Sequence, residues 1–287
     1  MMAYSIYKSP AGERAIMAWY DSALAHWPVP YEALNVSTRH GDTFVLASGA
    51  SGKGSDSPLI LLHGAGTNSA MWAGDVAAYS RQYRVYAVDL LGEPGKSAPV
   101  RPAWDGPAYA EWLADVLDAL KVEKATLLGL SQGGWTALKF AVYQPRRVES
   151  LVLLNPAGIA PDKLSFVIQA IPLSLLGPWG ISRINRLLFG SQPIPKEVDE
   201  ATTLIMTHFK TRVGVLPLFT EAELQRLSMP VLLLLGARDA LRDGQKISTR
   251  MQKLVPRLTT IIIPEAGHAL MNTPPHILPF LAEARRT

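Results

Sequence analysis

Short apolar runs alternate along this chain with longer segments of mixed polarity. Several of the apolar runs contain almost no polar residue, which is typical of central strands that are covered on both faces. The runs that we interpret as strands are residues 43–49, 58–64, 83–90, 125–130, 149–156, 230–239 and 259–268. This alternation predicts the α/β fold class, with helices packed on both faces of a mostly parallel sheet.

The segments between these runs carry apolar residues at helical spacing. Tyr109, Leu113, Val116 and Leu120, for example, recur every three or four positions and would share one face of a helix. The helices that we predict cover residues 69–79, 107–120, 132–143, 243–254 and 275–285, and an additional N-terminal helix covers about residues 11–27. Strands and helices thus alternate along most of the chain.

One region, from about residue 157 to residue 220, contains no strand pattern. Proline, glycine and large apolar residues are frequent there, and side chains such as Phe166, Trp179 and Phe189 are too numerous for a solvated loop. We therefore predict a helical cap inserted over the sheet. The expectation for the whole chain is a single domain, residues 1–287, with an eight-stranded sheet.

Composition excludes several classes of protein. The 287 residues are 48% hydrophobic, enough for a large core, and the absence of cysteine rules out disulfides and thiolate metal sites. The net charge of +4 is spread along the chain, so we expect no nucleic-acid partner. The apolar stretch that begins at Leu164 is interrupted by Gln169 and Pro172 and is shorter than the ~20 residues of a membrane span. We expect a cytoplasmic protein, and the sequence leaves its oligomeric state open.

The sequence gives no support for a cofactor or a metal ion. Gly64 and Gly66 follow a predicted strand, but the third glycine of a dinucleotide-binding loop is missing. No group of His, Asp and Glu has the spacing of metal ligands. We therefore predict chemistry that relies on side chains alone.

The candidate nucleophile is Ser131, at the centre of a G-x-S-x-G motif. It lies between a predicted strand that ends at residue 130 and a predicted helix that begins at residue 132. So tight a turn crowds the neighbouring chain, and glycines at 129, 133 and 134 remove the side chains that would collide. The hydroxyl would then stand at the carboxyl end of the sheet, beside a helix N-terminus that favours negative charge.

A serine hydroxyl needs a base, and the base needs a carboxylate that orients it. Of the six histidines, His268 is the one that follows a late strand near the C-terminus. Asp239 ends the preceding strand, and Asp243 is a weaker alternative. Asn155 occupies the rival strand end, but it cannot supply a charge. The order Ser131, Asp239, His268 is the order expected when such groups follow successive strands.

Four motifs together resemble the α/β-hydrolase fold family, from about residue 43 to residue 285. They are HGAG at 63–66, GLSQGG at 129–134, GARD at 236–239 and AGH at 266–268. Within the family, the chain looks most similar to single-domain bacterial carboxylesterases, C–C-bond hydrolases and cofactor-free haloperoxidases. The resemblance implies an oxyanion hole made by the backbone N–H groups of Ala65 and Gln132. The chain departs from the family pattern after Asp89, where the loop is one residue longer than usual, and Asp89 itself is expected to organise that loop.

These residues predict a serine hydrolase of the carboxylesterase type that cleaves small, uncharged, apolar carboxylic esters through an acyl-enzyme on Ser131. Phe166, Trp135 and His208 are the candidate residues of the substrate pocket. A C–C-bond hydrolase or a lactonase would use the same three groups and remains an alternative. A ligand-binding module that kept the fold without turnover is an alternative of another class.

Overall fold

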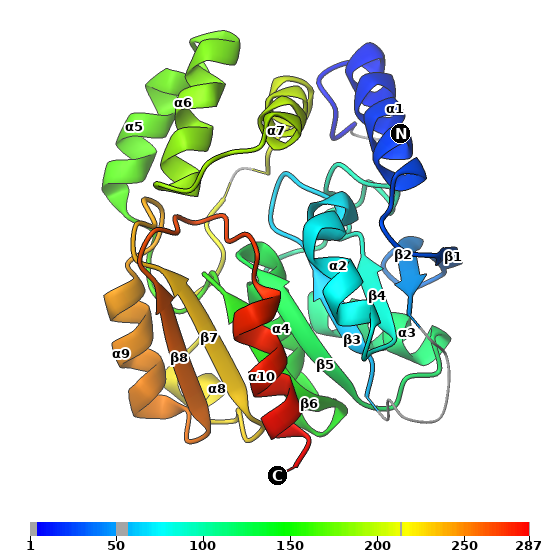
Figure 1. Ribbon diagram of the computed structural model, residues 1–287, viewed down its shortest axis with the longest axis vertical. Coiled ribbons are helices and arrows are strands. Elements are labelled where there is room, and N and C mark those ends of the chain that lie inside the picture. The colour runs from blue at the N-terminus through cyan, green and yellow to red at the C-terminus, as the bar shows by residue number, and fades with distance from the viewer. Residues whose placement is uncertain (1–4, 50–56, 213, 287) are drawn as a thin grey trace.

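The computed structural model describes residues 5–49, 57–212 and 214–286, which are built around one eight-stranded sheet (Figure 1). The strands are β1 (Tyr31–Val36), β2 (Thr43–Ser48), β3 (Leu59–Leu62), β4 (Val85–Val88), β5 (Ala125–Leu130), β6 (Val148–Leu154), β7 (Val231–Gly236) and β8 (Leu258–Ile263). Their order in the sheet is β1-β2-β4-β3-β5-β6-β7-β8. Only the pairings of β2 with β1 and with β4 are antiparallel, so the predicted mostly parallel, eight-stranded sheet is confirmed.

Strand β1 was not among the seven runs that the hydrophobic pattern identified. It lies at the edge of the sheet, and Val36 is its one buried residue. An edge strand that exposes polar side chains such as Glu32 and Asn35 lacks the apolar signal of a central strand. The pattern therefore found the apolar strands, including the partly exposed edge strand β8, and missed the polar edge strand β1.

Helices cover both faces of the sheet. They are α1 (Pro10–Ala25), α2 (Ala73–Ser80), α3 (Ala108–Ala119), α4 (Gln132–Tyr143), α8 (Glu221–Leu224), α9 (Gly244–Leu254) and α10 (Pro274–Ala284), with short 3-10 helices at Ser69–Trp72 and Pro145–Arg147. Helices α3, α4 and α9 share one apolar core with the sheet, whereas α1, α2 and α10 share the other. Side chains alternate between the two faces along each strand: Leu59 and Leu61 enter the second core, and Ile60 and Leu62 enter the first.

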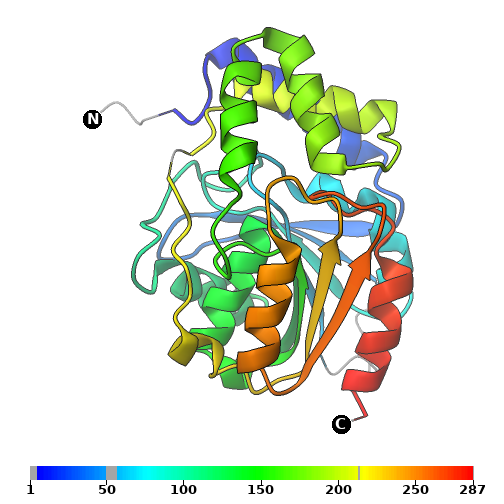
Figure 2. The ribbon, with the colours of Figure 1, turned by 90° about the vertical axis from the view of Figure 1, so that its left-hand side faces the viewer.

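Three helices follow β6 and lie above the carboxyl ends of the strands (Figure 2). They are α5 (Leu164–Ser174), α6 (Gly177–Phe189) and α7 (Lys196–His208), and we call them the cap. Helix α7 packs against α1, where Ile16, Ile205 and Phe209 form a small separate core. Helix α5 has no buried residue, and Leu175 at its C-terminal end is 82% exposed. Helices α6 and α7 both bury residues, so α5 is the poorly packed helix of the cap.

None of the helices in the described part of the chain combines the length and the apolarity that crossing a membrane requires.

Candidate active site

The predicted catalytic residues all lie in loops at one edge of the sheet. Ser131 directly follows β5, Asp239 lies three residues after β7, and His268 lies five residues after β8. Strands β5, β6, β7 and β8 are consecutive in the sheet and run parallel, so their carboxyl ends meet at the same edge. This topology places residues that are more than one hundred positions apart in one region of the molecule.

Ser131 occupies a strained turn between β5 and α4. Its φ of 53° and ψ of −109° lie in a region that residues other than glycine rarely adopt. The turn is possible because Gly129 and Gly133 come into close contact. A Cβ atom on Gly133 would collide with the carbonyl oxygens of Leu62 and His63. The surrounding chain thus holds the serine in one conformation, with its side chain at the start of a helix.

Asp239 and His268 are in direct contact, with 2.8 Å between Asp239 Oδ2 and His268 Nδ1. The other oxygen of Asp239 accepts hydrogen bonds from the backbone N–H groups of Leu241 and Arg242. Burial alone would raise the pKa of Asp239, but the neighbouring imidazole and these two N–H groups outweigh it and hold the pKa below its usual value. An ionised Asp239 keeps the proton of the neutral ring on Nδ1, which leaves Nε2 as a proton acceptor.

The two rival acid positions have structural roles. Asp243 is the N-cap of α9, where its side chain accepts a hydrogen bond from the Lys246 N–H. Asn155 donates through Nδ2 to the carbonyl oxygens of Gly267 and His268, and its Oδ1 accepts from the Gly236 N–H. Asn155 therefore ties the end of β6 to the end of β7 and to the histidine loop. Its place at a strand end was visible in the sequence, but its bridging role was not.

Ala65 and Gln132, the expected oxyanion-hole residues, lie at the ends of two adjacent strands. Gln132 is the first residue of α4, so its N–H is one of those at the helix start that have no partner within the helix. Ala65 is in the loop after β3, which His63 braces: His63 Nδ1 lies 2.8 Å from the Gly64 carbonyl oxygen, and His63 Nε2 accepts from the Leu90 N–H. Burial lowers the pKa of His63, so its ring is neutral and supports the loop rather than the reaction.

Asp89 organises the loop after β4, as expected. Its Oδ1 accepts hydrogen bonds from Tyr20 and from the N–H and hydroxyl of Ser69, and its Oδ2 accepts from the Lys96 N–H. A Cβ on Gly95 would collide with this carboxylate, which explains the glycine at that position. The carboxylate thus joins α1, the segment before α2 and its own loop.

Glu93, which sequence reasoning missed, lies in the same lengthened loop and is buried. Its Oε2 accepts a hydrogen bond of 2.7 Å from the Gly66 N–H, and its Oε1 accepts one of 3.2 Å from the Gln132 side chain. Burial raises the pKa of Glu93 to about 7, and these hydrogen bonds only partly oppose the rise. One carboxyl group therefore touches both segments that would form the oxyanion hole. The unusual loop length was the signal that could have drawn attention to it.

Arg242 is a second residue that sequence reasoning missed. It is 5% exposed, its backbone N–H donates to Asp239, and its Nη2 donates to Ser131 Oγ over 3.3 Å. Its Nη1 pairs with Asp162, at the beginning of the cap. Arg242 therefore connects the carboxylate, the serine hydroxyl and the cap. No sequence motif marks this arginine.

The candidate pocket residues have different surroundings. Phe166 is half-buried on α5. Trp135, however, is a core residue: it is 1% exposed, packs against Trp104, Tyr109 and Phe219, and donates its Nε1 hydrogen bond to the Pro217 carbonyl. The expectation that Trp135 lines the substrate pocket is therefore corrected. Trp135 lies on α4, close to the turn that carries Ser131, and its side chain faces the core of the sheet.

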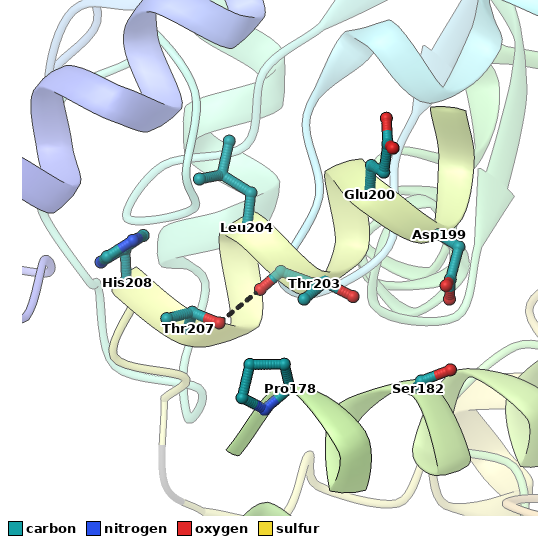
Figure 3. Close-up of a pocket in the computed structure, with 8 residues that line it drawn as sticks. All are labelled: Pro178, Ser182, Asp199, Glu200, Thr203, Leu204, Thr207 and His208. Carbon is teal, nitrogen blue, oxygen red and sulfur yellow. Dashed lines mark hydrogen bonds between the residues drawn. The ribbon is translucent and has the colours of Figure 1, made fainter. Parts of the chain in front are cut away.

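His208 lies in the cap, on the side that faces α1. It ends α7 and lies against Gly12 of α1, while its carbonyl oxygen accepts from the Lys8 N–H. Figure 3 shows it beside an open hollow of about 500 Å³ between α6 and α7. The hollow is lined by Pro178, Ser182, Asp199, Glu200, Thr203, Leu204, Thr207 and His208. None of the residues at the sheet edge lines this hollow, and the expected place of His208 in the substrate pocket stays a prediction.

Across the described ranges, no group of three or more His, Cys, Asp or Glu side chains is arranged to hold a metal ion. The residues at the sheet edge are instead a serine hydroxyl, an imidazole bonded to a carboxylate, and N–H groups at the start of a helix. This set can carry out nucleophilic attack with general-base assistance.

Comparison with known proteins agrees with this chemistry. A model of the alpha/beta hydrolase family matches residues 59–278, most of the chain. The protein belongs to the alpha/beta hydrolase family. Among its relatives in Bacillus subtilis, carboxylesterase YbfK is 35% identical over 268 residues, which cover 88% of this chain and 86% of the relative. A second, an uncharacterized carboxylesterase named nap, is 34% identical, with coverage of 90% and 88%.

Solved structures of this family superimpose closely on the protein. The crystal structure of carboxylesterase CesB (YbfK) from Bacillus subtilis has a TM-score of 0.84 at 32% identity and covers 95% of this chain and 99% of its own. The structure of naproxen esterase from the same organism has a TM-score of 0.83 at 30% identity, with coverage of 96% and 99%. The similarity to carboxylesterases thus includes both the sheet and the cap.

Proposed function

We propose that this alpha/beta hydrolase is a carboxylesterase that cleaves uncharged carboxylic esters through an acyl-enzyme on Ser131. The observation that carries the proposal is the hydrogen bond of 2.8 Å between Asp239 Oδ2 and His268 Nδ1, which lies at the same edge of the sheet as the strained Ser131. Similarity to carboxylesterases across nearly the whole chain supports the choice of an ester substrate.

In the proposed reaction, Ser131 Oγ attacks the ester carbonyl carbon while His268 Nε2 takes the hydroxyl proton. The carbonyl oxygen becomes an oxyanion that accepts hydrogen bonds from the Ala65 and Gln132 N–H groups, and Asp239 stabilises the imidazolium. The C–O bond to the alcohol then breaks, and the alcohol leaves with the proton from His268. Water, activated by the same imidazole, hydrolyses the acyl-enzyme and releases the acid.

Two kinds of alternative remain: enzymes that use the same three residues on another bond, and a binding protein that uses none of them for catalysis. A C–C-bond hydrolase or a lactonase would differ in the bond that breaks, and only activity measured on matched substrates separates them from an esterase. A binding module without turnover would not need a carboxylate bonded to an imidazole beside a strained serine. The hydrogen-bonded Asp239–His268 pair therefore favours an enzyme.

The test is Ser131→Ala, assayed with a fluorophosphonate probe and with p-nitrophenyl butyrate. We expect loss of labelling and a kcat at least about 10³-fold lower, because covalent attack disappears. Ser150→Ala is the matched control, since Ser150 is a buried serine on β6 whose hydroxyl is hydrogen-bonded to Thr126. Wild-type protein that is folded but neither labels nor hydrolyses esters would support the binding module, and a Ser131→Ala variant that retains activity would refute the nucleophile.

A further inference from the structure

The guanidinium of Arg242 is unusual for a site expected to bind uncharged esters. It lies in the loop between β7 and α9, is almost fully buried, and reaches within hydrogen-bond distance of the Ser131 hydroxyl. Burial lowers the pKa of Arg242, while the neighbouring carboxylates of Asp162 and Asp239 oppose that effect. An arginine remains protonated under these conditions, so a positive charge stands next to the candidate nucleophile.

The three nitrogens of Arg242 are used unequally. Nη1 pairs with Asp162, and Nη2 makes one long contact of 3.3 Å with Ser131 Oγ. Nε is buried and has no hydrogen-bond partner within the described residues. The N–H bonds of Nε and Nη2 point in the same direction along one edge of the planar group, and this edge is one that binds carboxylates with two parallel hydrogen bonds.

A purely structural role explains only part of this arrangement. The pair with Asp162 fastens the beginning of the cap to the loop after β7. Lys163 already fastens the same two segments, because its N–H donates to the Leu241 carbonyl and its Nζ donates to the Asp239 carbonyl. The ion pair with Asp162 accounts for Nη1, but it leaves the Nε–Nη2 edge with one weak contact. A buried donor without a partner destabilises the folded protein, so a ligand that satisfies this edge removes that cost.

We propose that the Nε–Nη2 edge of Arg242 is a carboxylate-binding subsite of the active site. The subsite rests on the proposed function, because the position of the ligand is fixed by the reaction at Ser131. A carboxylate oxygen bonded to Nη2 at about 2.9 Å lies within roughly 6 Å of Ser131 Oγ. That range includes the carboxylate of the acid released from the acyl-enzyme. It also includes a second carboxylate one or two carbons from the scissile carbonyl in a half-ester, a charged substrate that would replace the uncharged ester of the proposed function.

The test compares wild-type protein with Arg242→Gln, Arg242→Lys and the control Arg250→Gln. Arg250 is a partly buried arginine on α9 that donates to the carbonyl oxygens of Ile159 and Phe219, away from the serine. Lysine keeps the charge but lacks the two-pronged edge. The first measurement is competitive inhibition by butyrate and by its neutral analogue butyramide. We expect butyrate to bind wild type and Arg250→Gln at least tenfold more tightly than either Arg242 variant, with no such difference for butyramide.

The second measurement identifies the source of the carboxylate. It compares kcat/KM for monomethyl succinate with that for methyl 4-methylpentanoate, in which an isopropyl group replaces the carboxylate. A preference of at least tenfold for the half-ester in wild type, lost in Arg242→Gln, assigns the subsite to the substrate. Butyrate inhibition that depends on Arg242, without this preference, assigns it to the released acid.

Two results would overturn the subsite. One is an Arg242→Gln protein that is folded and labelled by fluorophosphonate, with unchanged butyrate inhibition and unchanged substrate preference. The other, which requires no variant to fold, is wild-type protein that binds butyrate no more tightly than butyramide in calorimetry. Wild type that fails to label or to hydrolyse esters refutes the proposed function instead, and the calorimetric comparison still measures the subsite.

Discussion

The carboxyl-terminal edge of the sheet and the cap are packed in different ways. At this edge, Ser131, Asp239 and His268 are each less than 10% exposed, and each lies in a short loop after a strand of the sheet. In the cap, the side chains of Leu164 on α5 and of Leu175 directly after it are 70% and 82% exposed. The edge is fixed by packing from the whole sheet, whereas α5 packs mainly on α6 and buries none of its residues. Substitutions at the edge should therefore affect turnover and stability far more than substitutions on α5.

The largest effect is expected when the carboxylate at the edge loses its charge. Asp239→Asn should lower kcat by about 10³-fold or more, because the amide cannot stabilise the imidazolium and can favour the wrong imidazole tautomer. Initial rates with p-nitrophenyl butyrate measure the loss. Asp243→Asn, which changes an N-cap four residues later, should leave kcat within a few-fold of wild type. A larger loss in Asp243→Asn than in Asp239→Asn would exchange the two assignments.

A smaller but distinctive effect should appear in the pH dependence of stability. Glu93 has a pKa of about 7 in the folded protein and an ordinary value when unfolded, so the folded state binds the extra proton between about pH 4.5 and 7. The free energy of unfolding should therefore fall as the pH rises through that window. Glu93→Gln does not titrate, so it should gain about 2 to 3 kcal/mol relative to wild type between pH 5 and pH 8.

Urea denaturation at the two pH values measures this difference. The cap supplies the matched control: Glu200 on α7 is exposed, so Glu200→Gln measures the effect of the same substitution on a side chain outside the site. If the free energy of unfolding of the two variants changed equally with pH, relative to wild type, the carboxyl group of Glu93 would be exposed to water in solution.

The smallest effect concerns selectivity, where the cap and the edge would have to cooperate. If half-buried Phe166 contacts the substrate, Phe166→Ala should shift the optimum chain length for p-nitrophenyl acyl esters between acetate and octanoate. The shift should be a few-fold in kcat/KM, since each buried methylene contributes about 0.8 kcal/mol. Ile168→Ala, two residues away and 63% exposed, should leave the profile unchanged. A Phe166→Ala profile that matches wild type would give this residue a role in packing the cap only.

The sequence predicted most of the fold because strands, helices and turns are signalled by residues that are close together in the chain. Continuous apolar runs identified the covered strands, and the glycines around Ser131 marked a turn that the structure shows to be crowded and strained. The edge strand β1 was missed because its outward side chains are polar. Trp135 was misplaced because an aromatic residue near a motif reveals nothing about the direction in which its side chain points.

Sequence patterns were sufficient to predict seven of the eight strands, the turn at Ser131, and the strand ends that carry Asp239 and His268. Which other side chains reach that edge depends on how the whole chain folds. Glu93 contacts the Gly66 and Gln132 segments, and Arg242 contacts Ser131 across 111 positions of sequence. The physical reason is that a strand or a turn depends on neighbouring residues, whereas a contact between loops depends on which parallel strands lie side by side in the sheet. That order follows from the packing of the whole chain.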